Sequence, residues 1–402
     1  MNPTDSTAIT RVCLRNYKSI AACDVELPPL TFLVGPNGSG KSNFLDALRF
    51  TAQALRFSPE HALRERGGIN EVRRRSRGHP NHFAIRVRFH VPGATGWYAF
   101  EIGARPKGRY FVRREQCVVR AAVPEHSGFF RIEDGEHRGN SIPHPPPTGG
   151  SDRLYLLPAS GYEAFRPVYD TLAGMGFYNL NPAQIRELQS PDPGDLLDRD
   201  GGNIASVLDR MKSHSPSDVG RIGDYLSRVV PGTNRVEPRT IGPKLTLEFR
   251  QQVRGDPNPW RFLANNVSDG TLRVLGVLAA LFQRPGASQS ARLVGIEEPE
   301  TALHPAAAGV LADILHEASR RVQVIVTSHS ADLLDRKTIP LESILAVVSE
   351  DGETRVSRLD EAGRTTLRDG LFTAGELLRL NQIAPDPESA VPSLLDLFRE
   401  ER

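Results

Sequence analysis

The sequence has few cysteines, few lysines and no long apolar run. Its three cysteines, Cys13, Cys23 and Cys117, form no CxxC pair among 402 residues, which argues against a disulfide framework and against a zinc site. No apolar stretch approaches the roughly 20 residues that a membrane-spanning helix needs. We therefore expect no membrane partner, and we exclude a transporter built from this one chain.

The first 19 residues, MNPTDSTAITRVCLRNYKS, also lack the apolar stretch of a signal peptide. From this absence we expect a cytoplasmic protein. Only six of the 50 basic residues are lysine. A GC-rich genome is the simpler explanation of so much arginine, and selection for bidentate phosphate contacts is the alternative. The net charge of +2 does not by itself indicate a nucleic-acid partner.

Hydrophobic periodicity changes several times along the first half of the chain. Residues 8–20 and 30–34 resemble strands, and residues 43–55 repeat apolar side chains at helical spacing. From 82 to 133 apolar and polar residues alternate, which predicts antiparallel strands joined by turns. Residues 163–232 have mainly helical spacing, without the sustained heptads of a long coiled coil.

The second half alternates strands with helices. KLTLEFRQQV (244–253) is typical of a strand. ARLVGI (291–296) and VQVIVT (322–327) are apolar strands, and a stretch with helical spacing follows each of them. Alternation of this kind indicates a parallel sheet and an α/β fold.

The segment GPNGSGKS at residues 35–42 has the spacing G-x4-G-K-S. Its glycines let backbone N–H groups turn inward around phosphates, and the following helix points its N-terminal dipole at them. Lys41 would reach the β- and γ-phosphates, and Ser42 would ligate Mg²⁺. The preceding strand and the following helix supply the context that this motif requires. We therefore predict ATP and Mg²⁺ as ligands, in preference to an ordinary glycine-rich turn.

Two carboxylates, Glu297 and Glu298, directly follow the apolar strand that ends at residue 296. The first would hold Mg²⁺ through water, and the second would polarise the attacking water. Taken alone, such a strand end is more typical of a solvated turn. In a chain that also has a P-loop, we interpret the pair as a metal ligand and a catalytic base.

Ser268 opens the apolar helix VLGVLAALF after VSDGTLR (267–273). Its ordinary role would be that of an N-cap. An N-capped helix start with Gly270 in its first turn also makes a second anion site. Because the chain has only one P-loop, this second site suggests a phosphate site shared between two copies.

His329 follows the apolar strand 322–327. A lone histidine at a strand end is usually structural. Here it stands at the carboxyl end of a predicted parallel strand, where ligands of α/β proteins bind. A hydrogen bond to the γ-phosphate would let it sense the loss of that phosphate.

These blocks, in this order, resemble the ATP-binding-cassette ATPase superfamily, and more closely its RecF/SMC-like branch of soluble ATPases. The residues that carry the resemblance are LRNYKSI (14–20), the P-loop, VSDGTLR (267–273), IEEPETALHP (296–305) and TSHS (327–330). The resemblance implies an ABC-ATPase-like P-loop fold of the α/β class, with a mixed sheet, an antiparallel β subdomain and a helical insertion. Residues 1–162 and 241–402 would form the two parts of the nucleotide-binding domain, and 163–240 the inserted arm.

The resemblance also implies roles for particular residues. Lys18 would lie near the ribose or α-phosphate, and Ser268 and Gly270 would contact the γ-phosphate of the other protomer's ATP. Glu298 would be the catalytic glutamate, His329 the switch histidine, and residues 300–304 the D-loop at the dimer interface. The expected catalytic residues are Lys41, Glu298 and His329. The expected nucleotide contacts are Lys18, Gly35, Asn37, Gly38, Ser39, Gly40, Lys41, Ser42, Asn43, Ser268 and Gly270. The expected metal ligands are Ser42 and Glu297.

Two functions remain open at this point. The first is an ATPase whose two copies form a homodimer head-to-tail around two ATP–Mg²⁺ and reopen after hydrolysis, in DNA repair, recombination or anti-phage defence. The second is a nucleotide-gated interaction module that controls a separate effector, such as a nuclease or toxin, with little turnover. For one basic cluster, an ordinary solvated surface is the favoured interpretation and contact with DNA or RNA phosphates is the alternative, so DNA is a possible partner. The cluster consists of Arg64, Arg66, Arg73, Arg74, Arg75 and Arg77.

Overall fold

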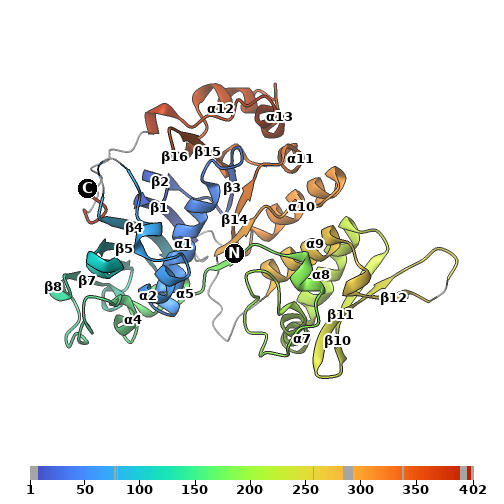
Figure 1. Cartoon of the computed structure of the whole chain (residues 1–402), viewed down its shortest axis with the longest axis horizontal. Helices are drawn as coiled ribbons and strands as arrows, with labels where there is room; N and C mark the ends of the chain where they lie inside the picture. Colours follow the sequence, from blue (N-terminus) through green and yellow to red (C-terminus); the bar gives the residue numbers. More distant parts are fainter. Residues whose placement is uncertain are drawn as a thin grey trace.

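The structure is a computed structural model that describes residues 8–76, 78, 80–256, 258–283, 293–336, 339–389 and 396–399. Within these ranges the chain forms three β-sheets, with helices packed between and around them (Figure 1). One sheet is central and mostly parallel, one is a large antiparallel sheet, and the third is a small antiparallel sheet beside the central helices.

The central sheet has the strand order β16-β15-β3-β14-β13-β9. Neighbouring strands are parallel, except that β16 is antiparallel to β15 at one edge. Every residue of β3 and β14 is buried, as expected for strands covered on both faces. The predicted parallel arrangement is confirmed. The strands are β3 (Leu30–Val34), β9 (Gly176–Tyr178), β13 (Leu293–Glu297), β14 (Gln323–Ser328), β15 (Ile344–Glu350) and β16 (Glu353–Arg358).

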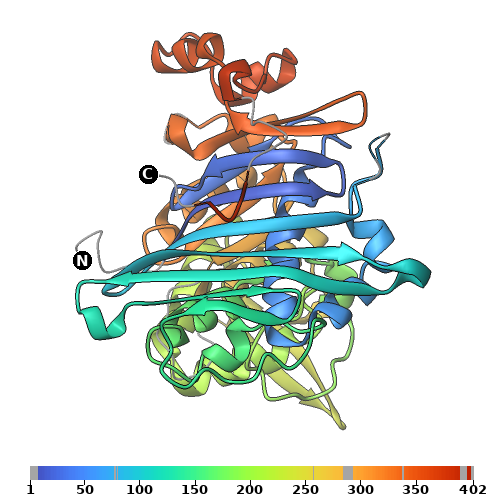
Figure 2. The ribbon, with the colours of Figure 1, turned by 90° about the vertical axis from the view of Figure 1, so that its left-hand side faces the viewer.

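The large antiparallel sheet has the order β2-β1-β4-β5-β6-β7-β8. The antiparallel strands predicted for residues 82–133 are confirmed, and β1 and β2 extend the same sheet from the N-terminal part of the chain (Figure 2). Its strands are β1 (Ala8–Tyr17), β2 (Ile20–Glu26), β4 (His82–Val91), β5 (Ala94–Ala104), β6 (Tyr110–Ala121), β7 (Gly128–Glu133) and β8 (Glu136–Asn140).

Helix α1 (Lys41–Arg56) packs against both of these sheets, and most of its side chains are buried. On the antiparallel side, the ring of Phe50 lies 5.3 Å from that of Phe83 and 6.3 Å from that of Tyr17. On the other side, Leu45 lies so close to Gly295 of β13 that a Cβ atom there would be 2.8 Å from it. The helix is therefore held in one core between the two sheets, which fixes its N-terminal end.

A second core covers the opposite face of the central sheet. It is built from α7 (Ile204–His214), α8 (Pro216–Val229), α9 (Asp269–Phe282) and α10 (Pro305–Ala318). The third sheet packs beside these helices and has the order β10-β11-β12, with β10 (Thr233–Ile241), β11 (Lys244–Gln251) and β12 (Trp260–Leu263). The strand predicted at 244–253 is confirmed by β11.

Short helices connect these layers. They are α2 (Pro59–Arg64), α3 (Ile69–Val72), α4 (Leu156–Ala159), α5 (Arg166–Ala173), α6 (Pro182–Arg186), α11 (Ala331–Leu334), α12 (Glu361–Arg368) and α13 (Ala374–Arg379). Single 3₁₀ turns are η2 (Pro106–Gly108), η3 (Pro124–His126), η4 (Ala264–Asn266), η5 (Leu341–Ser343) and η6 (Pro387–Ser389).

The segment 163–232 differs in one respect from its predicted, mainly helical structure. It contains α5 to α8, but it also contains β9, which pairs with β13 at the edge of the central sheet. A strand of three residues is too short for its periodicity to be visible in the sequence. The longest helix among the described residues is α1 with 16 residues, and no described helix is both long and apolar enough to cross a membrane.

The C-terminal segment 396–399 lies on the outer face of the antiparallel sheet (Figure 2). Leu397 is 1% exposed and Phe398 is 8% exposed, and both pack with Cys13 and Trp97. Arg86 lies over the Trp97 ring, 4.2 Å from its centroid, and donates hydrogen bonds to the carbonyls of Leu397 and Arg399. This segment therefore covers an apolar patch of the sheet.

Candidate functional site

Three loops meet at the carboxyl-terminal ends of the parallel strands of the central sheet. β14 lies between β3 and β13, with Ser328 opposite Val34 and Thr327 opposite Glu297. Because the strands are parallel and in this register, the P-loop after β3, the acidic pair at the end of β13 and His329 after β14 come together. The structure thus brings together, at one edge, residues that the sequence places almost 300 positions apart.

The P-loop turns tightly against the β15–β16 hairpin. Gly40 has φ 99° and precedes the first turn of α1. A Cβ atom at Gly40 would lie 2.0 Å from Thr354 Oγ1, and one at Gly35 would lie 1.9 Å from the Val347 carbonyl oxygen. Only glycine fits these two positions, since a side chain would collide with the hairpin and, at Gly40, also require a left-handed backbone.

Lys41 lies across the loop that precedes it. Its Nζ donates hydrogen bonds of 2.8 Å to the carbonyls of Gly35 and Pro36, and its side chain is buried. Burial lowers the pKa of Lys41, while the carboxylates of Glu298 and Glu300 act in the opposite direction. The ammonium group is therefore held inside the loop and faces the acidic strand end.

A hydroxyl and amide network supports the loop from behind. Asn43 Nδ2 donates to Ser19 Oγ at 2.7 Å, and Ser19 Oγ lies 2.7 Å from Thr354 Oγ1. Thr354 Oγ1 in turn donates to the Ser39 carbonyl at 2.9 Å. In this structure the Asn43 side chain is thus engaged with Ser19. Thr354 is not predicted because no motif includes it, and Ser19 stands in LRNYKSI (14–20) but is assigned no role from the sequence.

Lys18 stands beside α1 and pairs with Asp46 at 2.6 Å. Arg66 and Arg49 bind the same carboxylate, at 2.8 Å and 3.0 Å. Burial alone would raise the pKa of Asp46, but Arg66, Lys18 and Arg49 hold it well below its usual range. Tyr17 also donates its hydroxyl to Asp46, at 2.8 Å. Lys18 is therefore part of a charged cluster next to the P-loop helix.

A cavity of about 120 Å³ lies between this cluster and the end of β13. Ser42, Glu297 and Arg199 all line it. Arg199 Nη2 donates to Glu297 Oε1 at 2.7 Å. A serine hydroxyl and a carboxylate are oxygen donors of the kind that Mg²⁺ prefers, so the residues fit the metal that the sequence predicts.

Glu298 has φ 44°, which is unusual for a residue other than glycine. Its N–H donates to the Thr327 carbonyl at 3.0 Å, and its Oε1 lies 3.1 Å from His329 Nδ1. Both side chains are 40% exposed. The predicted catalytic glutamate and switch histidine are thus in direct contact at an accessible place. A strained backbone of this kind is frequent at functional sites.

Glu300 is a third acid near the site, and it is 7% exposed. Ser328 Oγ donates to its Oε1 at 2.6 Å, and burial raises the pKa of this carboxyl. Glu300 is thus an inner residue of the expected D-loop, whereas Thr301, Ala302 and His304 are exposed.

Ser268 caps helix α9 as the sequence predicts, with its Oγ accepting from the Thr271 N–H at 3.3 Å. Gly270 packs against the loop after β13, where a Cβ atom would lie 2.7 Å from the Ala302 carbonyl oxygen. The Ser268 side chain itself is exposed. The start of α9 and the loop 301–304 therefore form one exposed surface beside the site.

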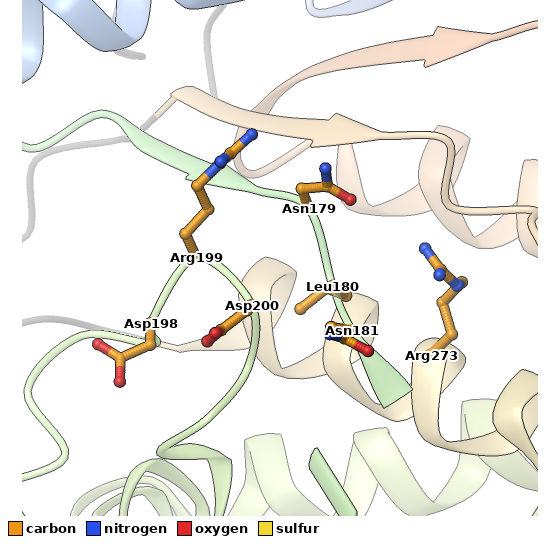
Figure 3. Close-up of a pocket in the computed structure, with 7 residues that line it drawn as sticks. All are labelled: Asn179, Leu180, Asn181, Asp198, Arg199, Asp200 and Arg273. Carbon is orange, nitrogen blue, oxygen red and sulfur yellow. The ribbon is translucent and has the colours of Figure 1, made fainter. Parts of the chain in front are cut away.

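A larger pocket, of about 560 Å³, adjoins the site (Figure 3). Arg199 and Arg273 line it from a loop and from α9, on either side of Asn179. Burial lowers the pKa of Arg273, and the carboxylates of Glu300, Glu298 and Asp269 act in the opposite direction. Neither arginine is assigned a role from the sequence: Arg199 belongs to no recognisable motif, and Arg273 only ends the segment VSDGTLR (267–273). The other lining residues are Leu180, Asn181, Asp198 and Asp200.

The arginine cluster singled out in the sequence is only partly a surface feature. Arg66 is buried with Asp46, which corrects its placement among the exposed arginines. Arg74 pairs with Glu353 at 2.7 Å, and Arg75 pairs with Glu71. Arg77 lies outside the described residues. The exposed part of the cluster is therefore smaller than the sequence suggests.

This fold and this site are those of a P-loop ATPase domain, and they are consistent with the ABC-type, RecF/SMC-like branch. Residues 30–335 match the family described as "AAA domain, putative AbiEii toxin, Type IV TA system". The match covers more than half of the chain, and the chain belongs to this family.

Solved structures support the fold. An SmcHead bound to the C-winged helix domain of ScpA is 15% identical, with a TM-score of 0.54 over 89% of this chain and 99% of that chain. The Smc head domain with an extended coiled coil from Pyrococcus furiosus, bound to the C-terminal domain of ScpA, is 13% identical, with a TM-score of 0.54 over 91% and 99%. At this identity the likeness concerns the fold alone.

A short stretch also matches a curated protein. It is 44% identical over 41 residues to the DNA replication and repair protein RecF of Vibrio vulnificus (strain YJ016). The match spans 10% of this chain and 11% of that protein.

Proposed function

We propose that this chain binds ATP with Mg²⁺, hydrolyses it, and does so in a head-to-tail dimer. The observation that carries the proposal is the meeting of the P-loop with Glu298 and His329 at one edge of the central sheet, where the glutamate and the histidine are 3.1 Å apart. A P-loop alone binds nucleotide, whereas hydrolysis also needs a group that positions water.

The nucleotide would lie on the P-loop, with Lys41 and the backbone N–H groups of residues 37–42 around its phosphates. Ser42 and Glu297 would hold Mg²⁺, which supplies charge neutralisation to the phosphates. These two residues fit the ion because both line the same cavity beside the P-loop. Lys18 would approach the ribose or α-phosphate from the neighbouring turn.

Glu298 would orient the attacking water and accept its proton as the water oxygen bonds to the γ-phosphorus. The bond from that phosphorus to the β–γ bridging oxygen breaks, which yields ADP and phosphate. With a proton on Nδ1, His329 donates to Glu298 Oε1, and we propose that the ring also carries a proton on its other nitrogen, which it donates to the γ-phosphate. Its contact with the base would then depend on the presence of that phosphate.

The dimer is proposed because the single P-loop needs a partner surface. The exposed start of α9, with Ser268 and Gly270, and the exposed loop 301–304 supply one. In a head-to-tail pair, this surface of one copy would close the P-loop of the other. The residues 1–162 and 241–402 would act as one nucleotide-binding domain, with 163–240 inserted between them, although β9 of this insertion is itself a strand of the central sheet.

The experiment that tests hydrolysis is the Glu298→Gln substitution. The amide keeps the shape of the side chain but cannot accept a proton, so ATP should bind while turnover falls about 100-fold or more. The variant should also accumulate as an ATP-bound dimer in light scattering. Glu136→Gln, on the exposed strand β8, is the control and should behave as the wild type.

Unchanged turnover in Glu298→Gln would refute the assignment of this residue. The same variant tests the alternative function. If it still controls an effector protein in the absence of turnover, a nucleotide-gated module is the better description.

The biological setting is a further proposal. The short likeness to RecF and the family description favour DNA repair, recombination or anti-phage defence, in the cytoplasm. DNA is a proposed partner, with Arg64 and Arg75 the exposed members of the cluster among the described residues. A separate effector protein is the other proposed partner, as the two Smc heads hold a domain of ScpA.

A further inference from the structure

Arg199 belongs to no motif, yet it occupies a defined place at the site. Its loop is fastened to the extension of β9, because Asn179 N–H donates to the Arg199 carbonyl and Asn181 N–H to the Asp200 carbonyl, each at 2.9 Å. Gly201 N–H closes the loop on the Asp198 carbonyl at 3.0 Å. The backbone of Arg199 is therefore fixed, whereas its side chain is 47% exposed.

The guanidinium group engages the carboxylate that is expected to serve the metal. Arg199 Nη2 lies 2.7 Å from Glu297 Oε1, and both residues line the small cavity together with Ser42. A cation already satisfies Glu297 in this structure. Mg²⁺ at this place would compete with the guanidinium for the same oxygen and would also repel it.

The other charged residues around the small cavity already have ion-pair partners or carry the same charge as Arg199. Asp46 is bound by Lys18, Arg49 and Arg66, so it offers Arg199 little further attraction. Arg49 faces Arg199 with the same charge, and this proximity contributes to lowering the pKa of Arg49, after the larger effect of burial. Among the described residues that line the small cavity, Glu297 is thus the acid that is left to Arg199.

An alternative position for the side chain lies next to it. Arg199 also lines the larger pocket, whose wall includes the carboxylates of Asp198 and Asp200 (Figure 3). Exchange of one exposed ion pair for another costs little free energy, because water screens both. The Arg199 side chain is long and flexible. It can therefore make this exchange by changing its rotamer, while the backbone of the loop stays fixed.

We propose that Arg199 is a built-in counter-cation for Glu297. When Mg²⁺ arrives with the nucleotide, the ion displaces the Arg199 guanidinium from this carboxylate. The proposal rests on the proposed ATP–Mg²⁺ site. The displaced guanidinium moves into the larger pocket. Arg199 thereby sets how much metal is needed for nucleotide binding, and it keeps Glu297 neutralised in the metal-free protein.

The test is Arg199→Gln, with ATP affinity measured by a fluorescent ATP analogue over a range of Mg²⁺ concentrations and in EDTA. Without its competitor, Mg²⁺ should give half-maximal nucleotide binding at about two- to fivefold lower concentration, the size of one exposed ion pair. In EDTA the variant should bind the analogue more weakly than the wild type, because Glu297 then repels the phosphates. A merely structural role would shift both affinities in the same direction.

Three further variants sharpen the result. Arg199→Lys keeps the charge and should retain most of the wild-type metal dependence. In a Glu297→Gln background, Arg199→Gln should bring no further gain in metal sensitivity. Arg210→Gln removes an arginine of α7 that pairs with Asp195 at 2.8 Å, and it should leave both affinities unchanged.

Two outcomes separate this proposal from the proposed function. If the wild type binds the analogue with Mg²⁺ but Arg199→Gln has the same metal dependence, or loses affinity equally with and without metal, the role of Arg199 is refuted and the ATP site stands. If the wild type binds no nucleotide under any condition, the proposed function fails, and the role of Arg199 fails with it.

Discussion

Several charged residues in this protein have unusual environments. Glu298 combines a left-handed backbone with a histidine contact, and Lys41 is a buried cation inside its own loop. Arg199 forms an ion pair with Glu297, which the sequence predicts to be a metal ligand. Each of these features lies at the same edge of the central sheet, which is where a phosphate-binding protein needs concentrated charge.

One titratable residue away from the site makes a testable prediction at this scale. Glu115 of β6 is fully buried, and burial raises its pKa to about 7, although Tyr155, Leu156 and Tyr98 donate hydrogen bonds to it. The folded state therefore binds its proton more tightly than the unfolded chain, in which the pKa is 4.5. Stability from this group is complete below pH 4.5 and is lost as pH rises to about 7, by about 3 kcal/mol in total.

The measurement is urea unfolding of the wild type and of Glu115→Gln at several pH values between 4.5 and 8. The free energy of unfolding of the wild type should fall relative to that of the variant across this range. Glu136→Gln serves as an exposed control and should follow the wild type. Parallel pH profiles for the wild type and Glu115→Gln would show that Glu115 does not titrate in this window.

At the scale of elements, the sequence predicts what is strongly periodic. The strand 30–34, the helix 43–55 and the antiparallel strands of 82–133 are all confirmed, because each buries one regular set of apolar residues. β9 is not predicted, because a strand of three residues is too short to show a hydrophobic periodicity. The docking of residues 396–399 on the antiparallel sheet is not predicted either, since nothing local in DLFR specifies the surface that it covers.

The candidate site divides in the same way. Lys41, Ser42, Glu298 and His329 stand in motifs, so their types and spacing are enough to indicate phosphate chemistry. Arg199 and Thr354 act only through tertiary contacts, and the sequence around them is ordinary. Ser19 stands in the motif LRNYKSI, but its contact with Thr354 is tertiary and is not predictable from that motif. The prediction for Arg66 is wrong: the sequence suggests a surface arginine, but Arg66 is the buried partner of Asp46.

The C-terminal segment provides a prediction at the element scale. Leu397 and Phe398 cover Cys13, whose thiol has its pKa raised to about 12, mainly by burial and also by Asp24. In Leu397→Ala/Phe398→Ala this cover is lost. A thiol reagent should then modify Cys13 about tenfold faster or more in the native protein, as a locally opened segment exposes it.

Mass spectrometry after limited labelling identifies which cysteine has reacted, because Cys23 and Cys117 are also buried. Leu380→Ala is the control, since Leu380 is 52% exposed and covers no cysteine. Equal labelling rates in the double variant and the wild type would mean that the segment does not protect this face.

At the scale of the whole molecule, we propose that one chain supplies half of a catalytic site. The two cores hold α1 and α9 on opposite faces of the central sheet, so the P-loop and the Ser268 surface are presented in fixed directions. The single P-loop and the exposed start of α9 would complete each other only in a pair of chains. Hydrolysis should therefore be a property of two chains and not of one.

The most direct test is the rate of ATP hydrolysis per chain, measured against chain concentration, with the oligomeric state followed by light scattering. We predict that the rate per chain rises with concentration and reaches a plateau as dimers form. Ser268→Arg, which places a bulky cation on the pairing surface, should keep ATP binding and lose both the dimer and the rate. A rate per chain that is constant at all concentrations, in a protein that stays monomeric with ATP, would contradict the account.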